Sequence, residues 1–155
     1  MIDQNAPTIR PAVPEEAPML TALTLRSKAH WGYDDGFMSA AVAELTITPD
    51  YILQHAVFLL QIADDILGYV SLVDQGEELL LDNLFIEPEH IGIGYGRMLW
   101  QRAVDYARQA GYQSIILVAD PNAAPIYTRL GAVQYGEEAS NIQTGRMLPK
   151  MRFAL

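Results

Sequence analysis

The sequence predicts a mixed α/β (α+β) fold, in which a mostly antiparallel central sheet is flanked by about four helices. Short strand-like segments joined by turn residues occupy the middle of the chain, as in an antiparallel meander. One strand–helix–strand unit follows, and its second strand contains the continuous apolar run 115–118 that is typical of a buried central strand. This order of elements favours a mixed sheet over a doubly wound one.

Helix signals and hydrophobic periodicity place the individual elements. Pro14 is followed by Glu15 and Glu16, and acids in a first turn stabilise the positive end of a helix dipole. Residues 97–110 repeat apolar side chains on one helical face, and Gly111 supplies a natural stop. The expected helices span residues 14–28, 37–44, 97–110 and 123–130, and the expected strands span residues 8–13, 56–62, 66–73, 77–87, 113–119, 133–136 and 147–154.

Composition limits the classes of function. The chain has 155 residues, 50% of them hydrophobic, so we expect one domain over residues 1–155 with its own core. The formal net charge of -9 disfavours nucleic-acid partners. It would attract a cationic substrate, although solubility is the simpler reading. The chain has no cysteine, which excludes disulfides, thiolate metal sites and a cysteine nucleophile.

No segment of the sequence has the pattern of a membrane span or a secretory leader. Apolar runs such as residues 56–60 are far too short to cross a bilayer. Residues 1–11 lack the basic start and the apolar run of a signal peptide. We therefore expect a soluble cytoplasmic protein that has neither a membrane partner nor a metal.

A glycine-rich turn lies between an expected strand and an expected helix; its residues are Gly92, Ile93, Gly94, Tyr95 and Gly96. Alternate glycines let the backbone approach a ligand closely. The amides and the dipole of the following helix favour an anion there, so a pyrophosphate could bind with little help from basic side chains. Arg97 and Met98 follow where a P-loop needs Lys and Ser/Thr, and Arg97 stands where a dinucleotide fingerprint needs glycine. A purely structural turn is the alternative.

Two segments carry a resemblance to a known family. Residues 81–96 read LDNLFIEPEHIGIGYG, and residues 119–132 read ADPNAAPIYTRLGA. Both segments, and their separation, resemble the GNAT superfamily of acyl-CoA N-acyltransferases. Ile91 stands where this family usually has Gln or Arg, and Ala132 replaces the usual Phe. Two further stretches, SKAHWGY at residues 27–33 and GRMLP at residues 145–149, look like a bacterial subgroup that acts on small substrates.

The resemblance implies acetyl-CoA as co-substrate. The backbone of residues 84–86 should hold the pantetheine and the acetyl oxygen at a β-bulge. Asn122 resembles a residue that contacts CoA near the pantetheine, and a helix cap is its alternative role. The implied CoA-binding residues are Leu84, Phe85, Ile86, Ile91, Gly92, Ile93, Gly94, Tyr95, Gly96, Arg97, Asn122 and Tyr127.

Family members transfer the acetyl group directly to an amine, which requires a base and an acid. Asp82 is the candidate base; on a strand it would share a face with Leu80, Leu84 and Ile86, and its short side chain favours a water relay. An exposed or salt-bridged acid is the alternative, and His30 is the second candidate base. Tyr127 is the candidate acid, since the matching hydroxyl in the family faces the CoA sulfur; an ordinary core tyrosine is its alternative.

The acceptor is expected to be a small-molecule amine. Trp31 and Tyr33, beside acidic Asp34 and Asp35, would form an aromatic pocket for a cation, or would pack helix against sheet. His30 lies next to this pair, and Arg146 would bind an acceptor carboxylate or serve at the surface. A non-enzymatic acyl-CoA sensor on the same fold is the alternative function. Many family members are dimers, which leaves a homodimer open.

Overall fold

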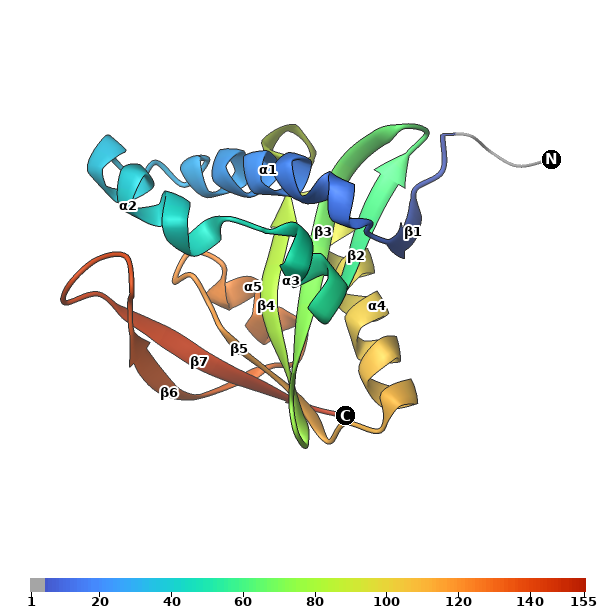
Figure 1. Ribbon diagram of the computed structural model, residues 1–155. Helices are drawn as coiled ribbons and strands as arrows, with labels where there is room; N and C mark the ends of the chain where they lie inside the picture. Colours follow the sequence, from blue (N-terminus) through green and yellow to red (C-terminus); the bar gives the residue numbers. More distant parts are fainter. Residues whose placement is uncertain (1–4) are drawn as a thin grey trace.

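The central element of the protein is a twisted mixed sheet. The computed structural model describes residues 5–155, and these residues form a seven-stranded sheet of order β1-β2-β3-β4-β5-β7-β6 (Figure 1). All neighbouring strands are antiparallel except β4 and β5, which run parallel. The strands are β1 Thr8–Pro11, β2 Ala56–Ile62, β3 Asp65–Gln75, β4 Glu78–Ile86, β5 Ser114–Val118, β6 Val133–Ala139 and β7 Met147–Ala154.

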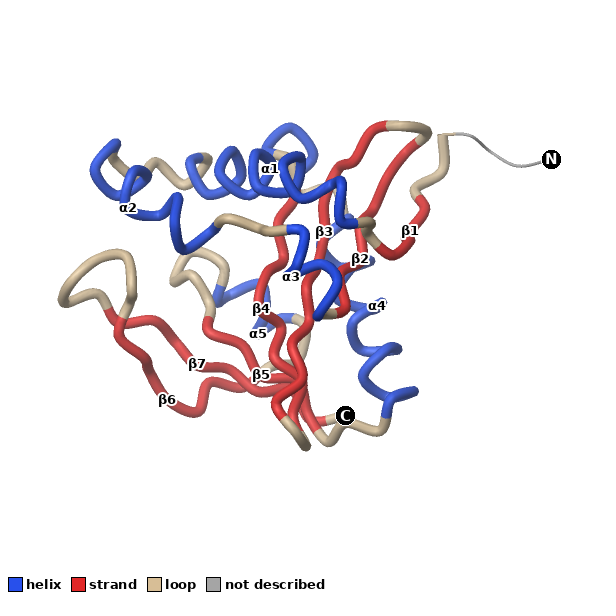
Figure 2. Tube along the Cα trace, viewed as in Figure 1, coloured by secondary structure: helices blue, strands red, loops and turns tan. Residues whose placement is uncertain are grey.

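Helices cover both faces of this sheet. The helices are α1 Ala17–Ala29, α2 Asp35–Leu45, α3 Pro49–Gln54, α4 Tyr95–Ala110 and α5 Ala124–Arg129, with 3-10 turns at Pro14–Glu16 and Pro88–His90. The alternation of β2 separates two cores: Val57 and Leu59 pack with α1 and α3, whereas Phe58 and Leu60 pack with α4. The helical layer formed by α1 to α3 and the separate α4 are visible in Figure 2. No helix within residues 5–155 is long and apolar enough to cross a membrane.

The expected fold class is confirmed, with one helix more than expected. Helix α3 was missed because its six residues are too short for hydrophobic periodicity to show. Its start signal is nevertheless present in the sequence: the Thr48 hydroxyl accepts a hydrogen bond from the Tyr51 amide at 3.1 Å, and Pro49 occupies the first turn. The other boundaries differ by a few residues; β6, for example, runs on to Ala139.

The parallel pair opens into a wedge. Strands β4 and β5 are paired over three residue pairs, from Glu78↔Ser114 to Leu80↔Ile116. Beyond Leu80, β4 continues to Ile86 with no partner strand on this side, while β5 follows β7 through Val118↔Lys150. The separation of the two strands can be followed in Figure 1. The free edge of β4 therefore offers unpaired backbone groups to a ligand.

Candidate active site

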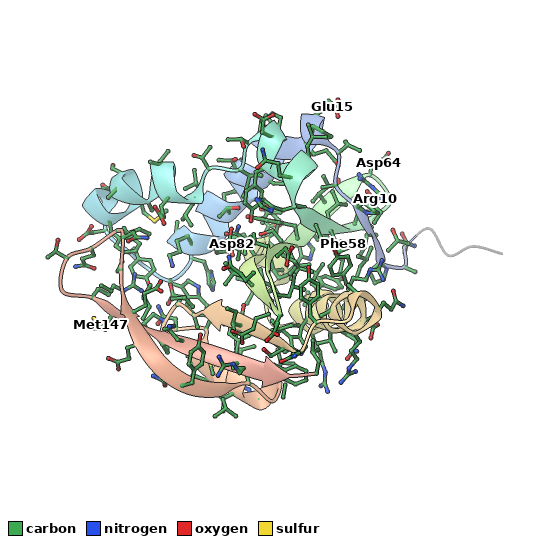
Figure 3. All side chains as sticks on the ribbon, turned by 60° about the horizontal axis from the view of Figure 1, so that its bottom comes forward. Arg10, Glu15, Phe58, Asp64, Asp82 and Met147 are labelled. Atoms are coloured by element: carbon green, nitrogen blue, oxygen red, sulfur yellow. The ribbon has the colours of Figure 1, made fainter. Side chains whose placement is uncertain are left out.

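The wedge between β4 and β5 continues into the main cleft of the molecule. Its volume is about 990 Å³, and its walls come from β4, β5, the start of α4, the end of α1 and the β6–β7 segment. Asp82 lies on β4 between the layer of α1 to α3 and the β6–β7 hairpin, whose second strand begins at Met147 (Figure 3). A space of this size is typical of a small-molecule or cofactor site.

The glycine-rich turn forms one end of this cleft. Gly92 and Gly94 have φ angles of +88° and +109°, in the left-handed region that favours glycine, and a Cβ at either position would have no atom within 4 Å. Gly96 differs, since a Cβ there would lie 3.7 Å from Leu84 Cδ2, an ordinary contact. Glycine at the first two positions is therefore required by the backbone and leaves open space above it.

The N-terminus of α4 is uncapped. Its first helical hydrogen bond is donated by the Met98 amide to the Gly94 carbonyl at 3.2 Å, and no side chain caps the helix. In the described part of the chain the amides of residues 95–97 consequently have no partner. These three donors and the positive end of a 16-residue helix favour an anion.

Not every residue of the expected CoA site faces the cleft. The side chains of Ile93 and Tyr95 do not line it: Ile93 is 60% exposed, and Tyr95 packs against the core beneath α4. Ile91 lines the cleft and also packs on this core, so the position offers no side-chain donor. Any contact of the turn with a phosphate must therefore come mainly from backbone amides.

The bulge in β4 lies earlier than expected. Residues 84–86 pair regularly with β3, whereas the register shifts between Leu72↔Leu81 and Ser71↔Asn83 and leaves Asp82 as the extra residue. The expected bulge at residues 84–86 is therefore wrong by two positions. The free edge of residues 81–86 still faces the wedge and still provides the backbone groups assigned to the pantetheine.

The bulge also corrects the expected orientation of Asp82. One inserted residue shifts the side-chain alternation, so Leu81 before the bulge and Leu84 and Ile86 after it all pack beneath α4. Asp82 does not share their face. Its Oδ2 instead accepts a hydrogen bond of 2.5 Å from the Tyr51 hydroxyl of α3, while the side chain stays exposed to the cleft.

Tyr51 is a cleft residue that the sequence did not reveal. Its single proton goes to Asp82, so its oxygen accepts a hydrogen bond from the Ser71 hydroxyl at 2.9 Å, and the Asn83 amide donates to Ser71 Oγ at 2.9 Å. Burial, followed by the hydrogen bond to Asp82, raises the pKa of Tyr51 well above its ordinary value. The phenol therefore stays protonated and fixes Asp82 Oδ2, while Oδ1 has no partner among the described residues.

Tyr127 lies on the opposite side of the cleft from this network, on α5. Tyr127 is 8% exposed, and its ring contacts Trp100 edge-on with 5.9 Å between the ring centroids. Its hydroxyl has no hydrogen-bond partner within residues 5–155. Every fully buried side-chain oxygen and nitrogen in that range is hydrogen-bonded, so the Tyr127 hydroxyl is not fully buried and reaches the cleft that the residue lines. Burial raises the pKa of Tyr127 well above its ordinary value, which keeps the phenol protonated.

A polar cluster closes the cleft near the end of β5. We call it the Asp120 cluster; its members are Lys28, Tyr33, Asp120, Asn122 and Arg146. Asp120 Oδ2 accepts hydrogen bonds from Lys28 Nζ at 2.5 Å and from the Tyr33 hydroxyl at 2.7 Å, and Arg146 Nη2 lies 3.6 Å away. Arg146 also donates to the Tyr33 hydroxyl. Lys28 and Asp120 were not expected in the site, although Lys28 lies in the stretch 27–33 and Asp120 in the segment 119–132 described above.

The cluster also has ionisation properties of its own. Burial opposes ionisation of Asp120, but the hydrogen bonds from Lys28 and Tyr33 outweigh it, so the pKa of Asp120 lies below its ordinary value. Burial and the hydrogen bond to Asp120 raise the pKa of Tyr33 to about 12. At neutral pH Asp120 is therefore a carboxylate and Tyr33 a neutral phenol.

Asn122 belongs to the Asp120 cluster and does not cap α5. Its side-chain amide donates to Asp120 Oδ1 at 3.0 Å and to the Tyr33 hydroxyl at 3.1 Å, and the residue does not line the cleft. The N-cap of α5 is Ala123, without a side-chain cap, so the expected helix-cap role is wrong. A contact of Asn122 with CoA stays a prediction.

The aromatic acceptor pocket also differs from expectation. The Tyr33 ring is stacked on Phe37, with 4.0 Å between the ring centroids, and Lys28 Nζ lies 5.2 Å from the Tyr33 centroid. The Phe37 ring and the Lys28 ammonium therefore occupy the surroundings of Tyr33 where an acceptor cation was expected. Asp34 caps α2 through the Phe37 amide at 2.7 Å. Trp31 lines the cleft, whereas His30 is exposed and does not line it, which disfavours His30 as the base.

Comparisons with known proteins agree with this geometry. The model of the acetyltransferase (GNAT) family matches residues 24–132, which is more than half of the chain. The chain therefore belongs to the GNAT family of acetyltransferases. No curated protein sequence matches it.

Solved structures confirm the fold. A GCN5-related N-acetyltransferase from Rhodopseudomonas palustris superposes with a TM-score of 0.79 at 20% identity, covering 100% of this chain and 99% of that one. The paia N-acetyltransferase of Thermoplasma acidophilum, solved with coenzyme A, gives 0.79 at 13% identity, with 97% and 99% covered. The yncA structure from Salmonella typhimurium, solved with acetyl-CoA, gives 0.69 at 22% identity, with 96% and 94% covered.

Proposed function

We propose that the protein transfers an acetyl group from acetyl-CoA directly to the nitrogen of a small-molecule amine. The observation that carries this proposal is a convergence in one cleft. The uncapped start of α4, the free edge of β4 and the Tyr127 hydroxyl all open into the same 990 Å³ space. They supply an anion site, backbone partners for an amide-containing arm and a proton donor.

The cofactor assignment follows from two of these features. The amides of residues 95–97 and the left-handed turn at Gly92 and Gly94 would receive the pyrophosphate. The backbone of residues 81–86 would pair with the amides of the pantetheine, as an added strand would. The relatives solved with coenzyme A and acetyl-CoA have the same fold and support this choice of co-substrate.

The transfer takes two protons off the acceptor nitrogen and puts one on the sulfur. Asp82 takes the first proton from the acceptor ammonium, through a water, because its side chain is short and lines the cleft. The acceptor nitrogen then attacks the thioester carbonyl carbon, so that a C–N bond forms and the C–S bond breaks. The Tyr127 hydroxyl gives its proton to the departing sulfur and regains one, through solvent, from the nitrogen, which still carries one proton more than an amide. Asp82 releases its proton to solvent, which leaves free CoA and the N-acetyl product.

Related structures do not name one acceptor. One is a ribosomal-protein-S18-alanine N-acetyltransferase from Escherichia coli at 16% identity, and another is a nourseothricin acetyltransferase at 24% identity over 65% of this chain. The choice of acceptor must therefore come from residues of this cleft, such as Trp31, Tyr51 and Arg146.

The test is thiol release from acetyl-CoA in the presence of an amine panel, with CoA affinity measured separately by calorimetry. We expect CoA to bind and at least one amine to stimulate thiol release. Binding of CoA without stimulated release by any amine would contradict the enzyme and favour an acyl-CoA sensor. Failure to bind CoA would contradict both.

A further inference from the structure

The Asp120 cluster carries an excess positive charge within an acidic protein. Two cations, Lys28 and Arg146, face one carboxylate, Asp120, and the side chains are only 11%, 16% and 12% exposed, respectively. The chain as a whole has a formal net charge of -9. A second cation held out of water beside a single carboxylate is costly unless an anion compensates it.

Both cations also have donors to spare. Arg146 uses only Nη2, toward the Tyr33 hydroxyl and Asp120, so Nε and Nη1 have no partner within residues 5–155. No fully buried side-chain nitrogen in that range is unpaired, so both free nitrogens of Arg146 must reach the solvent in the cleft that the residue lines. Lys28 Nζ, with three protons, makes one hydrogen bond and lines the same cleft.

The guanidinium is held in place before any ligand binds. It lies beside the stacked pair of Tyr33 and Phe37 rings, with Arg146 Cζ 4.9 Å and 5.1 Å from their centroids, and it donates a hydrogen bond to the Tyr33 hydroxyl. A cation that is already held by contacts within the protein loses little entropy when it binds an anion. The cluster is therefore a preorganised anion site on the wall of the cleft.

We infer that this site binds the carboxylate of the acceptor, so that the acceptor is an amino acid or another small amine that bears a carboxylate. This inference rests on the proposed function, because it assigns the acceptor to the same cleft. One excess charge matches a monoanionic carboxylate better than a dianionic phosphate. The phosphates of CoA have their own site at the start of α4, on another wall of the cleft.

The test uses product binding, which does not depend on turnover. With CoA present, calorimetry compares a panel of N-acetyl amino acids with the matching N-acetyl amino acid amides, which lack the carboxylate. We expect at least one acid to bind about tenfold or more tightly than its amide, in line with a charge-assisted hydrogen bond. Arg146→Gln should abolish this difference. The control Arg108→Gln removes the same charge from the exposed end of α4 and should preserve it.

Several results would overturn the inference. Acids and amides that bind equally, or no binding of any acid, would reduce the cluster to a clasp between α1 and the β6–β7 segment. An unchanged preference in Arg146→Gln would do the same. CoA affinity shows whether each variant is folded. If Arg146→Gln does not fold, Arg146→Lys keeps the charge without the planar guanidinium and should lower the preference for acid over amide severalfold. Acid-selective binding without thiol release would instead contradict the proposed function alone.

Discussion

Tyr127→Phe separates a catalytic hydroxyl from a packed ring, because it removes one oxygen and nothing else. The Tyr127 ring keeps its edge-on contact with Trp100 at 5.9 Å, and the lost hydroxyl has no hydrogen-bond partner within residues 5–155. No internal hydrogen bond is therefore lost. We expect the free energy of unfolding to change by less than about 0.5 kcal/mol, measured by urea denaturation.

The kinetic effect should be much larger. General acid catalysis is worth about 10²–10⁴-fold, and a thiolate is already a fair leaving group, so we expect kcat to fall about 100-fold. The affinity for acetyl-CoA should stay within about twofold, because the hydroxyl acts only when the C–S bond breaks. Steady-state kinetics with a confirmed acceptor and calorimetry with CoA give the two numbers separately. A kcat within about twofold of the wild type would reject Tyr127 as the acid.

The direction of the Tyr127 pKa adds a second check. Burial raises this pKa above its ordinary value, so the protonated phenol, which is the active form of an acid, persists beyond pH 10. The kcat of the wild type should therefore show no alkaline decline between pH 7 and 10 that is absent from Tyr127→Phe. Such a Tyr127-dependent decline would show that the phenol ionises too easily for the surroundings described here.

Three further perturbations test the rest of the site. Gly94→Val should weaken CoA binding at least tenfold by calorimetry, and it should cost about 1–2 kcal/mol of stability because φ at this position is +109°. The control Gly96→Ala should leave CoA affinity intact and gain about 0.5–1 kcal/mol of stability. Equal CoA affinities in the two variants would contradict the anion site. Asp82→Asn should lower kcat while CoA affinity stays unchanged, and an unchanged kcat would make Asp82 structural. Because the pKa of Asp120 is lowered in the folded protein, its ionised form stabilises the fold above its ordinary pKa, and this stabilisation is lost as the pH falls below that value. Asp120→Asn should lower the free energy of unfolding by about 3 kcal/mol at pH 7, because Lys28 loses its partner. In urea titrations the variant should also lose less stability on acidification than the wild type.

The sequence predicted those parts of the fold that local signals determine. Helix α4 was predicted because it combines a one-sided apolar pattern with Gly111 as its stop, and β5 because of its apolar run. The bulge at Asp82 was not predictable, because the residues LLLDNLFI alternate equally well in either register. A single inserted residue then decides which face of β4 each later side chain occupies.

In the candidate site, too, the features that depend on local sequence were predicted and those that depend on distant contacts were not. The turn at Gly92 and Gly94 was located because its conformation and its place before a helix are local properties. The ion pair between Lys28 and Asp120 joins residues 92 positions apart, and no local pattern reports such a contact. Tyr51 was missed for the same reason, since its role follows from the approach of α3 to β4.

The bulge explains how β4 can present apolar side chains to one face of the sheet and polar side chains to the other. Before and after it, the apolar side chains Leu81, Leu84 and Ile86 support α4, whose uncapped start holds the anion site. At the bulge itself, Asp82 and Asn83 lie on the other face, where both meet the Tyr51 hydroxyl. A regular strand that kept Leu81 beneath α4 would place Leu84 and Ile86 on the same face as Asp82, away from this core. The inserted residue is therefore the feature that lets Leu84 and Ile86 pack beneath α4 while Asp82 and Asn83 meet Tyr51 on the other face.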